Sequence, residues 1–178
     1  MPMNLLPFDS DALRTVGQAH DIAEDRLADF YKFSIGQWKR HRYDVKTLHE
    51  LKSEEITSNA FALLNRYGRV KGDFELKTRD WDFYFICIQD HEIRKALKSD
   101  RNLKLLPLLV YVLTHELVHI VRFCNFSQRF EAPARGRAEE ERVVHEITHK
   151  ILESLPLSEL DYVLASYEGH RMCRTTFS

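Results

Sequence analysis

Two short stretches of this sequence carry the pattern His-Glu-x-x-His, whose residue types and spacing can bind a metal ion. The first reads His115-Glu-Leu-Val-His119, and the second, 30 residues later, reads His145-Glu-Ile-Thr-His149. On an α-helix, side chains four residues apart point in nearly the same direction, so two imidazoles at this spacing can bind one ion. The glutamate after the first histidine projects to the side, where it can reach a metal-bound water. The pattern therefore predicts a metal centre that activates water.

Zinc is the ion that suits such a centre. A Zn²⁺ ion held by three protein ligands keeps a fourth position for water and lowers the pKa of that water to about 7. A neighbouring carboxylate can accept a proton as the hydroxide attacks a carbonyl, and can then donate that proton to the leaving group. We therefore expect one Zn²⁺ per chain and hydrolytic chemistry.

The residues around the first copy resemble the active-site helix of the zincin metallopeptidases. The zincin pattern asks for Val or Thr three positions before the first histidine, and Val112 stands there. It also asks for uncharged or hydrophobic residues inside and directly after the motif, and these positions hold Leu117, Val118, Ile120 and Val121. The resemblance implies that His115 and His119 are zinc ligands and that Glu116 is the general base of a peptidase.

The second copy departs from the zincin pattern at both ends. Arg142 stands where Val or Thr is expected, and Lys150 follows the second histidine. A positively charged side chain would thus lie where a zinc site that excludes water needs apolar neighbours. On a helical wheel, Glu146 and His149 point away from the buried stripe. That stripe consists of Val143, Val144, Ile147 and Ile151. We therefore expect this copy to be part of an amphipathic helix and not a second zinc site.

The helix that carries the second copy is expected to supply the third zinc ligand. In the gluzincin branch of the zincins, a glutamate on a later helix completes the coordination. Glu141 lies 22 residues after His119, which leaves room for a turn and a returning helix. Glu140 and His145 remain alternatives, since His145 stands where gluzincins usually have Asp. Glu141 is the predicted ligand and His145 its hydrogen-bonding partner, although Glu139 to Glu141 could also be an acidic first turn that complements the helix dipole.

Two other functions fit the same motifs. Glu116-x-x-His119 and Glu146-x-x-His149 both match the ExxH element that carboxylate-bridged di-iron bundles use twice. Further carboxylates for such a site would come from Glu24, Asp25, Glu54 or Glu55. However, the second motif begins only 26 residues after the end of the first, which leaves too little chain for the extra helix that these bundles usually place there. The other possibility is a regulatory protein that binds zinc without turnover.

The composition favours a soluble single domain. The chain has 178 residues, and its 26 Lys and Arg nearly balance its 27 Asp and Glu. This balance gives no basic field for nucleic acid. Its three cysteines form no CxxC pair, which favours a reducing compartment. The apolar run Leu105–Leu113 is shorter than the ~18 residues that a membrane-spanning helix needs. We expect a cytoplasmic protein with a peptide or protein substrate and neither nucleic-acid nor membrane partners, and its oligomeric state stays open.

The hydrophobic periodicity predicts an α+β fold in which helices dominate. A zincin-like active-site helix would accompany a small mixed or antiparallel sheet. Residues 1–178 would form one domain, with an N-terminal helical region (1–68) followed by the sheet and the metal-site helices (69–178). The expected helices are Ser10–Ile35 (capped by Asp9 or Ser10), Leu48–Tyr67, His91–Leu97, Leu105–Phe123, Pro133–Leu155 and a last one capped by Ser158 and ending at Ser166.

The strands are expected between Val70 and Gln89, where aromatic and β-branched residues are dense. The clearest of them is Trp81–Ile88. Because it directly precedes the metal motif, it could form the cleft edge along which an extended peptide binds. Tyr84 or Tyr111 could polarise a substrate carbonyl, but both are expected in the core.

Overall fold

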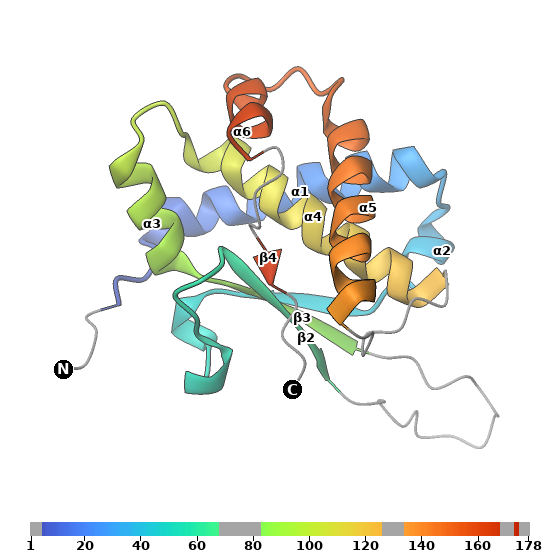
Figure 1. Ribbon diagram of the computed structural model, residues 1–178, viewed down its shortest axis with the longest axis horizontal. Helices are drawn as coiled ribbons and strands as arrows, with labels where there is room; N and C mark the ends of the chain where they lie inside the picture. Colours follow the sequence, from blue (N-terminus) through green and yellow to red (C-terminus); the bar gives the residue numbers. More distant parts are fainter. Residues whose placement is uncertain (1–4, 68–82, 126–133, 168–172, 175–178) are drawn as a thin grey trace.

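The structure is a computed structural model that describes residues 5–67, 83–125, 134–167 and 173–174 (Figure 1). The fold is α+β with helices dominant, as predicted. The helices are α1 (Ser10–Tyr31), α2 (Ile35–Trp38), α3 (Asp90–Ser99), α4 (Leu105–Asn125), α5 (Ala134–Leu152) and α6 (Leu160–Ser166). The strands are β1 (Tyr43–Lys46), β2 (Ala62–Tyr67), β3 (Phe83–Ile88) and β4 (Cys173–Arg174).

The four strands form one mixed sheet in the order β1-β3-β2-β4. Strand β3 pairs in parallel with β1 and antiparallel with β2, and β4 runs parallel to β2. The predicted strand Trp81–Ile88 is confirmed as β3, although Trp81 and the rest of 68–82 lie outside the described residues. Since β3 has a neighbour on each side, it offers no free edge to a peptide, and the prediction of a cleft edge there is wrong.

The helix predicted for Leu48–Tyr67 is wrong. This segment contains two 3₁₀ turns, Leu48–Glu50 and Ser53–Glu55, followed by β2. Strand β2 pairs with β3 along its whole length. This long-range pairing outweighs the helical spacing of the apolar residues. The N-terminal region is therefore not purely helical, since it contributes β1 and β2 to the sheet.

The residues predicted to begin and end the helices agree with the structure at some helix ends and differ from it at others. The Asp9 side chain caps α1 by accepting a hydrogen bond from the Ala12 amide at 2.8 Å, as predicted. Helix α1 ends earlier than predicted, because Lys32 takes the left-handed conformation with φ of 56°. Ser158 does not cap α6. Glu159 holds that position, with φ of 64° and no side-chain cap bond.

Helix α4 forms the centre of the molecule. It packs against α1, α5 and α6 and over the sheet (Figure 1), and every residue from Pro107 to Val121 is buried. A helix that is enclosed on all sides needs apolar residues all round, which explains its composition. By length and composition alone, Leu105–Cys124 could cross a membrane, but most of this window is buried inside the protein, as in the core helix of a soluble protein.

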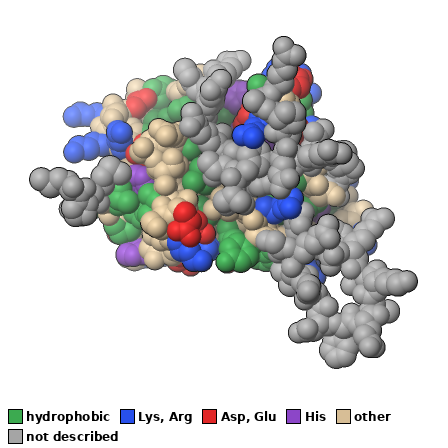
Figure 2. Space-filling model, turned by 60° about the horizontal axis from the view of Figure 1, so that its bottom comes forward, with side chains coloured by type: hydrophobic (Ala, Val, Ile, Leu, Met, Phe, Trp, Pro, Cys, Tyr) green, Lys and Arg blue, Asp and Glu red, His purple; other side chains and the backbone are tan. Residues whose placement is uncertain are grey.

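The sheet is covered on both faces. Tyr84, Ile86 and Ile88 of β3 join the main core beneath α4. On the opposite face, Leu63 and Cys87 pack with residues of the segment before β2, namely Leu51 and Ala60. The described part of the surface seen in Figure 2 carries acidic and basic side chains next to each other among hydrophobic ones.

Candidate metal centre

The two histidines of the first motif lie on the face of α4 that meets α5. Their Nε2 atoms approach one carboxylate, that of Glu141 on α5. The distance from His115 Nε2 to Glu141 Oε2 is 3.2 Å, and that from His119 Nε2 to Glu141 Oε1 is 3.0 Å. The structure thus brings together the three residues that the sequence predicted as zinc ligands.

The spacing and chemistry of these three groups fit a zinc ion. Ligand bonds of ~2.0–2.2 Å at tetrahedral angles place the ligand atoms about 3.3–3.5 Å from one another. The two nitrogen-to-oxygen distances of 3.2 and 3.0 Å are close to this value, and all three ligand atoms lie within 4.8 Å of one another. Among the described residues, this is the one group of three His, Cys, Asp or Glu side chains placed to hold a metal ion.

The centre is enclosed on the α4 side and open to solvent on the α5 side. The side chains of His115 and His119 are 4% and 1% exposed, whereas that of Glu141 is 34% exposed. Burial acts to raise the pKa of Glu141, but its interactions with His115 and His119 outweigh burial and lower that pKa well below its usual range. The carboxylate is therefore ionised, as a metal ligand must be.

Glu140, the neighbouring candidate ligand, has a different partner. Its carboxylate receives two hydrogen bonds from the Arg122 guanidinium of α4, at 2.5 and 2.9 Å. The consecutive residues Glu140 and Glu141 thus contact different parts of α4. The bidentate pair with Arg122 occupies Glu140, so the geometry favours Glu141 among the two carboxylates.

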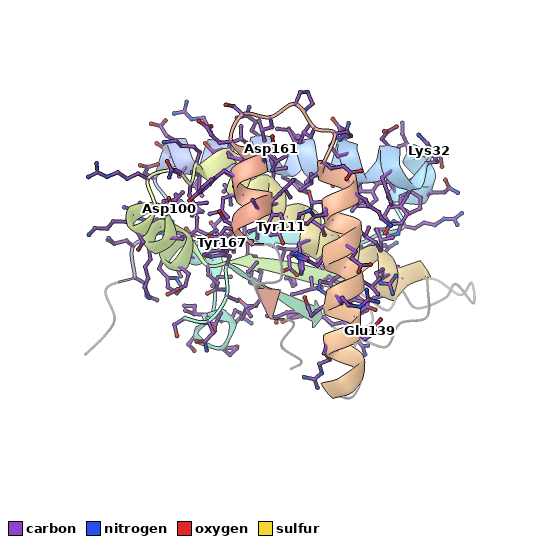
Figure 3. All side chains as sticks on the ribbon, turned by 45° about the horizontal axis from the view of Figure 1, so that its top comes forward. Lys32, Asp100, Tyr111, Glu139, Asp161 and Tyr167 are labelled. Atoms are coloured by element: carbon purple, nitrogen blue, oxygen red, sulfur yellow. The ribbon has the colours of Figure 1, made fainter. Side chains whose placement is uncertain are left out.

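His145, the third candidate, lies one helical turn beyond Glu141 on α5. Its Nδ1 atom is 3.0 Å from the hydroxyl of Tyr111 on α4, within hydrogen-bond distance. Tyr111 is buried in the core, as predicted, between α5 and α6 in the view of Figure 3. Its ring centroid is 6.3 Å from that of His115. His145 is thus linked to the ligand helix through Tyr111, which places it beside the metal centre.

Glu116, the predicted general base, is completely buried on α4. It lies close enough to β3 for its charge to affect Cys87. Burial raises the pKa of the Cys87 thiol to about 12, with further contributions from the charges of Glu55 and Glu116, while the charge of Lys46 acts in the opposite direction. This carboxylate directly follows His115 in the chain and is shielded from bulk water.

The second motif has the same local spacing as the first but different surroundings. The ring centroids of His145 and His149 are 5.1 Å apart, and those of His115 and His119 are 5.0 Å apart. Glu146, however, is exposed and forms an ion pair with Arg142. Glu139, which also pairs with Arg142, lies on the outer side of α5 (Figure 3).

The buried stripe of α5 differs from the prediction. Its fully buried members are Val144, Thr148, Ile151 and Leu152. Val143 and Ile147 are only half-buried, and His149 is half-buried instead of solvated. The stripe is rotated because α5 packs on α4 and α1 together.

We expect the two histidines of the second motif to differ in their effect on zinc. Replacing His145 with alanine removes the hydrogen bond to Tyr111 and should weaken zinc binding by about 10- to 100-fold, the range for residues that support metal ligands. His149→Ala should leave zinc affinity unchanged. Competition with a chromophoric chelator measures both values. Loss of zinc in His149→Ala would show that the second motif is part of the metal centre.

Two residues near the centre were not predicted to support it. Tyr111 lies four residues before His115, and Arg122 lies three residues after His119, so both share the ligand face of α4. The sequence does contain a signal for Arg122. It is the one Lys or Arg of a largely apolar helix, and such a charge needs a partner when it is buried.

Of the four carboxylates proposed to complete a di-iron site, Asp25 and Glu54 are exposed, and Glu24 and Glu55 have other partners. Glu24 accepts a hydrogen bond from the hydroxyl of Tyr43, and Glu55 forms an ion pair with Lys46 at 3.2 Å. Glu146 faces solvent with Arg142. The geometry of these described residues therefore does not favour the di-metal alternative.

Comparison of the chain with protein-family models, curated proteins and solved structures found no match. The function must therefore be inferred from the residues of the site and their geometry.

Proposed function

We propose that this protein is a zinc-dependent metallopeptidase of the zincin type. The observation that supports this proposal is the convergence of His115 and His119 on α4 with Glu141 on α5. The two helices place two imidazoles and one carboxylate at distances that suit zinc, and Glu116 adjoins His115 on the same turn. This is the arrangement that the resemblance of the first motif to zincins implies.

In the proposed mechanism, His115, His119 and Glu141 would hold the zinc ion. When bound, zinc supplies a Lewis acid and lowers the pKa of its water to about 7. Glu116 accepts the proton of the attacking water and delivers it to the amine nitrogen that leaves when the peptide bond breaks. Because Glu116 is fully buried, this transfer takes place away from bulk water. The substrate approaches from the α5 side, where Glu141 is partly exposed.

A zinc-binding protein without turnover is the alternative that the same geometry permits. It would share the ligands and differ only in the role of Glu116. A direct assay of hydrolysis separates the two functions.

The experiment uses the full chain, purified without an affinity tag and loaded with one equivalent of Zn²⁺. We expect hydrolysis of casein or of a mixture of fluorogenic peptides. A chelator such as 1,10-phenanthroline should abolish the activity, and added Zn²⁺ should restore it. Bound zinc without any hydrolysis would favour the non-catalytic alternative, and two bound irons would favour the di-metal site.

A further inference from the structure

Polar side chains pair across the interface of α4 and α5 on both sides of the metal centre. On α4 they follow one another at intervals of three or four residues and so share one face of the helix. Each of them meets a polar side chain of α5 at the same level. The α4 members are Tyr111, His115, His119 and Arg122, and the α5 members are Glu140, Glu141 and His145.

The pair formed by Arg122 and Glu140 is bidentate and largely enclosed. Nε of Arg122 is 2.5 Å from Oε1 of Glu140, and Nη2 is 2.9 Å from Oε2. Only 15% of the arginine side chain and 12% of the glutamate side chain are exposed. The hydrogen bond with Glu140 raises the pKa of the Arg122 guanidinium. Two parallel bonds between planar groups fix both the separation and the orientation of the two side chains.

Arg122 also lies near α1. Burial raises the pKa of Tyr31, at the end of α1, and the charges of Arg122 and Glu140 both act on it. The guanidinium therefore lies within electrostatic reach of the end of α1, and only 15% of its side chain is exposed.

The position of this pair along the helices connects it to the zinc ligands. Arg122 lies three residues beyond His119, and Glu140 directly precedes Glu141. Fixing the Glu140 carboxylate against α4 therefore fixes the α5 backbone at the next residue. We propose that Arg122 is a positioning residue, whose bidentate bond with Glu140 holds the Glu141 carboxylate against the two ligand histidines. This inference rests on the zinc site of the proposed function but not on its hydrolytic activity.

If the Arg122–Glu140 pair only stabilised the fold, its replacement would affect thermal stability and not metal binding. The cost of desolvating two charges largely offsets their attraction when an ion pair is enclosed, so such pairs contribute little net stability. The pair still fixes the orientation of the two side chains through the planar guanidinium. A lysine cannot reproduce this effect, because its ammonium acts as a point charge. The effect of changing Arg122 to Lys should therefore appear in metal binding more than in thermal stability.

The test compares Arg122→Lys with Arg142→Lys in the full chain. Arg142 is the matched control, since it also forms ion pairs with glutamates, Glu139 and Glu146, but on the exposed side of α5. We expect Arg122→Lys to weaken Zn²⁺ binding by about 10- to 100-fold and to change the visible absorption spectrum of the Co²⁺-substituted protein. Arg142→Lys should change neither. Thermal unfolding of the metal-free variants, followed by circular dichroism, checks whether each variant is folded.

A second variant keeps the test decisive if Arg122→Lys does not fold. Glu140→Gln retains the shape of the side chain but replaces one of its two acceptor oxygens with an amide donor, so it breaks the bidentate geometry and should weaken Zn²⁺ binding similarly. In a double-mutant cycle, Arg122→Lys combined with Glu140→Gln should weaken zinc no more than either change alone, because both remove one interaction.

Unchanged zinc affinity and an unchanged Co²⁺ spectrum in the folded Arg122 or Glu140 variants would overturn the inference, even if their melting temperature fell. Both readouts measure metal binding. A parent chain that binds zinc without hydrolysing peptides would therefore contradict the proposed function while the comparison of Arg122 with Arg142 still stands.

Discussion

Glu116→Gln should keep one zinc bound per chain and lose peptide hydrolysis. Glutamine has nearly the same shape as glutamate and can still hydrogen-bond a water molecule, but it cannot accept a proton. General acid–base catalysis typically contributes ~10²–10⁴-fold to a rate, so we expect a loss of at least this size. Zinc content and hydrolysis are measured on the same purified variant.

Glu146→Gln is the matched control for this change. It alters the glutamate at the same place in the second motif, where the side chain is exposed and paired with Arg142. We expect normal zinc content and normal hydrolysis. If Glu116→Gln lost its metal, Glu116 would be a ligand, as in the di-metal alternative. If it kept full activity, another group would be the base.

Replacing either His115 or His119 with alanine should remove stoichiometric zinc. Each change leaves one imidazole and one carboxylate, fewer than the three protein ligands that a catalytic zinc site normally has. The zinc content per chain should fall from one to nearly zero after dialysis, as measured by inductively coupled plasma mass spectrometry. Hydrolysis should fall with it, because the proposed activity depends on the Lewis acid that zinc would supply.

Both histidines are almost completely buried, so the fold of each variant must be checked by circular dichroism. His149→Ala serves as the comparison, since it removes an imidazole from the same position of the second motif. Full zinc content in both His115→Ala and His119→Ala would rule out the site on α4.

The residues of the first motif could be predicted from the sequence because their geometry is local. The α-helix alone places His115 and His119 on one face. The apolar flanks that enclose α4 are also visible in the sequence. Glu141 can approach the two histidines only if the chain turns after α4 and a second helix packs back against it. The spacing of 22 residues between His119 and Glu141 allows this, but it does not determine which acidic residue faces the histidines. Only the packing of α5 on α4 separates Glu141 from Glu140.

The sheet was less predictable because its pairing is between distant segments. The apolar residues of β2 have a spacing that also suits a helix, and the strand forms because β3 pairs along its whole length. The position of β3 inside the sheet depends on β1 and β2, which lie earlier in the chain. Nothing in the sequence of β3 itself distinguishes an inner strand from an edge. For this reason the sequence did not show that β3 lies inside the sheet and offers no free edge.

A crystal structure of the zinc-loaded protein, with anomalous diffraction data collected at the zinc absorption edge, tests the central claim most directly. We predict one anomalous peak per chain, from a zinc ion at bonding distance from Nε2 of His115, Nε2 of His119 and the carboxylate of Glu141. A peak between His145 and His149, or no peak near α4, would contradict the proposed metal centre.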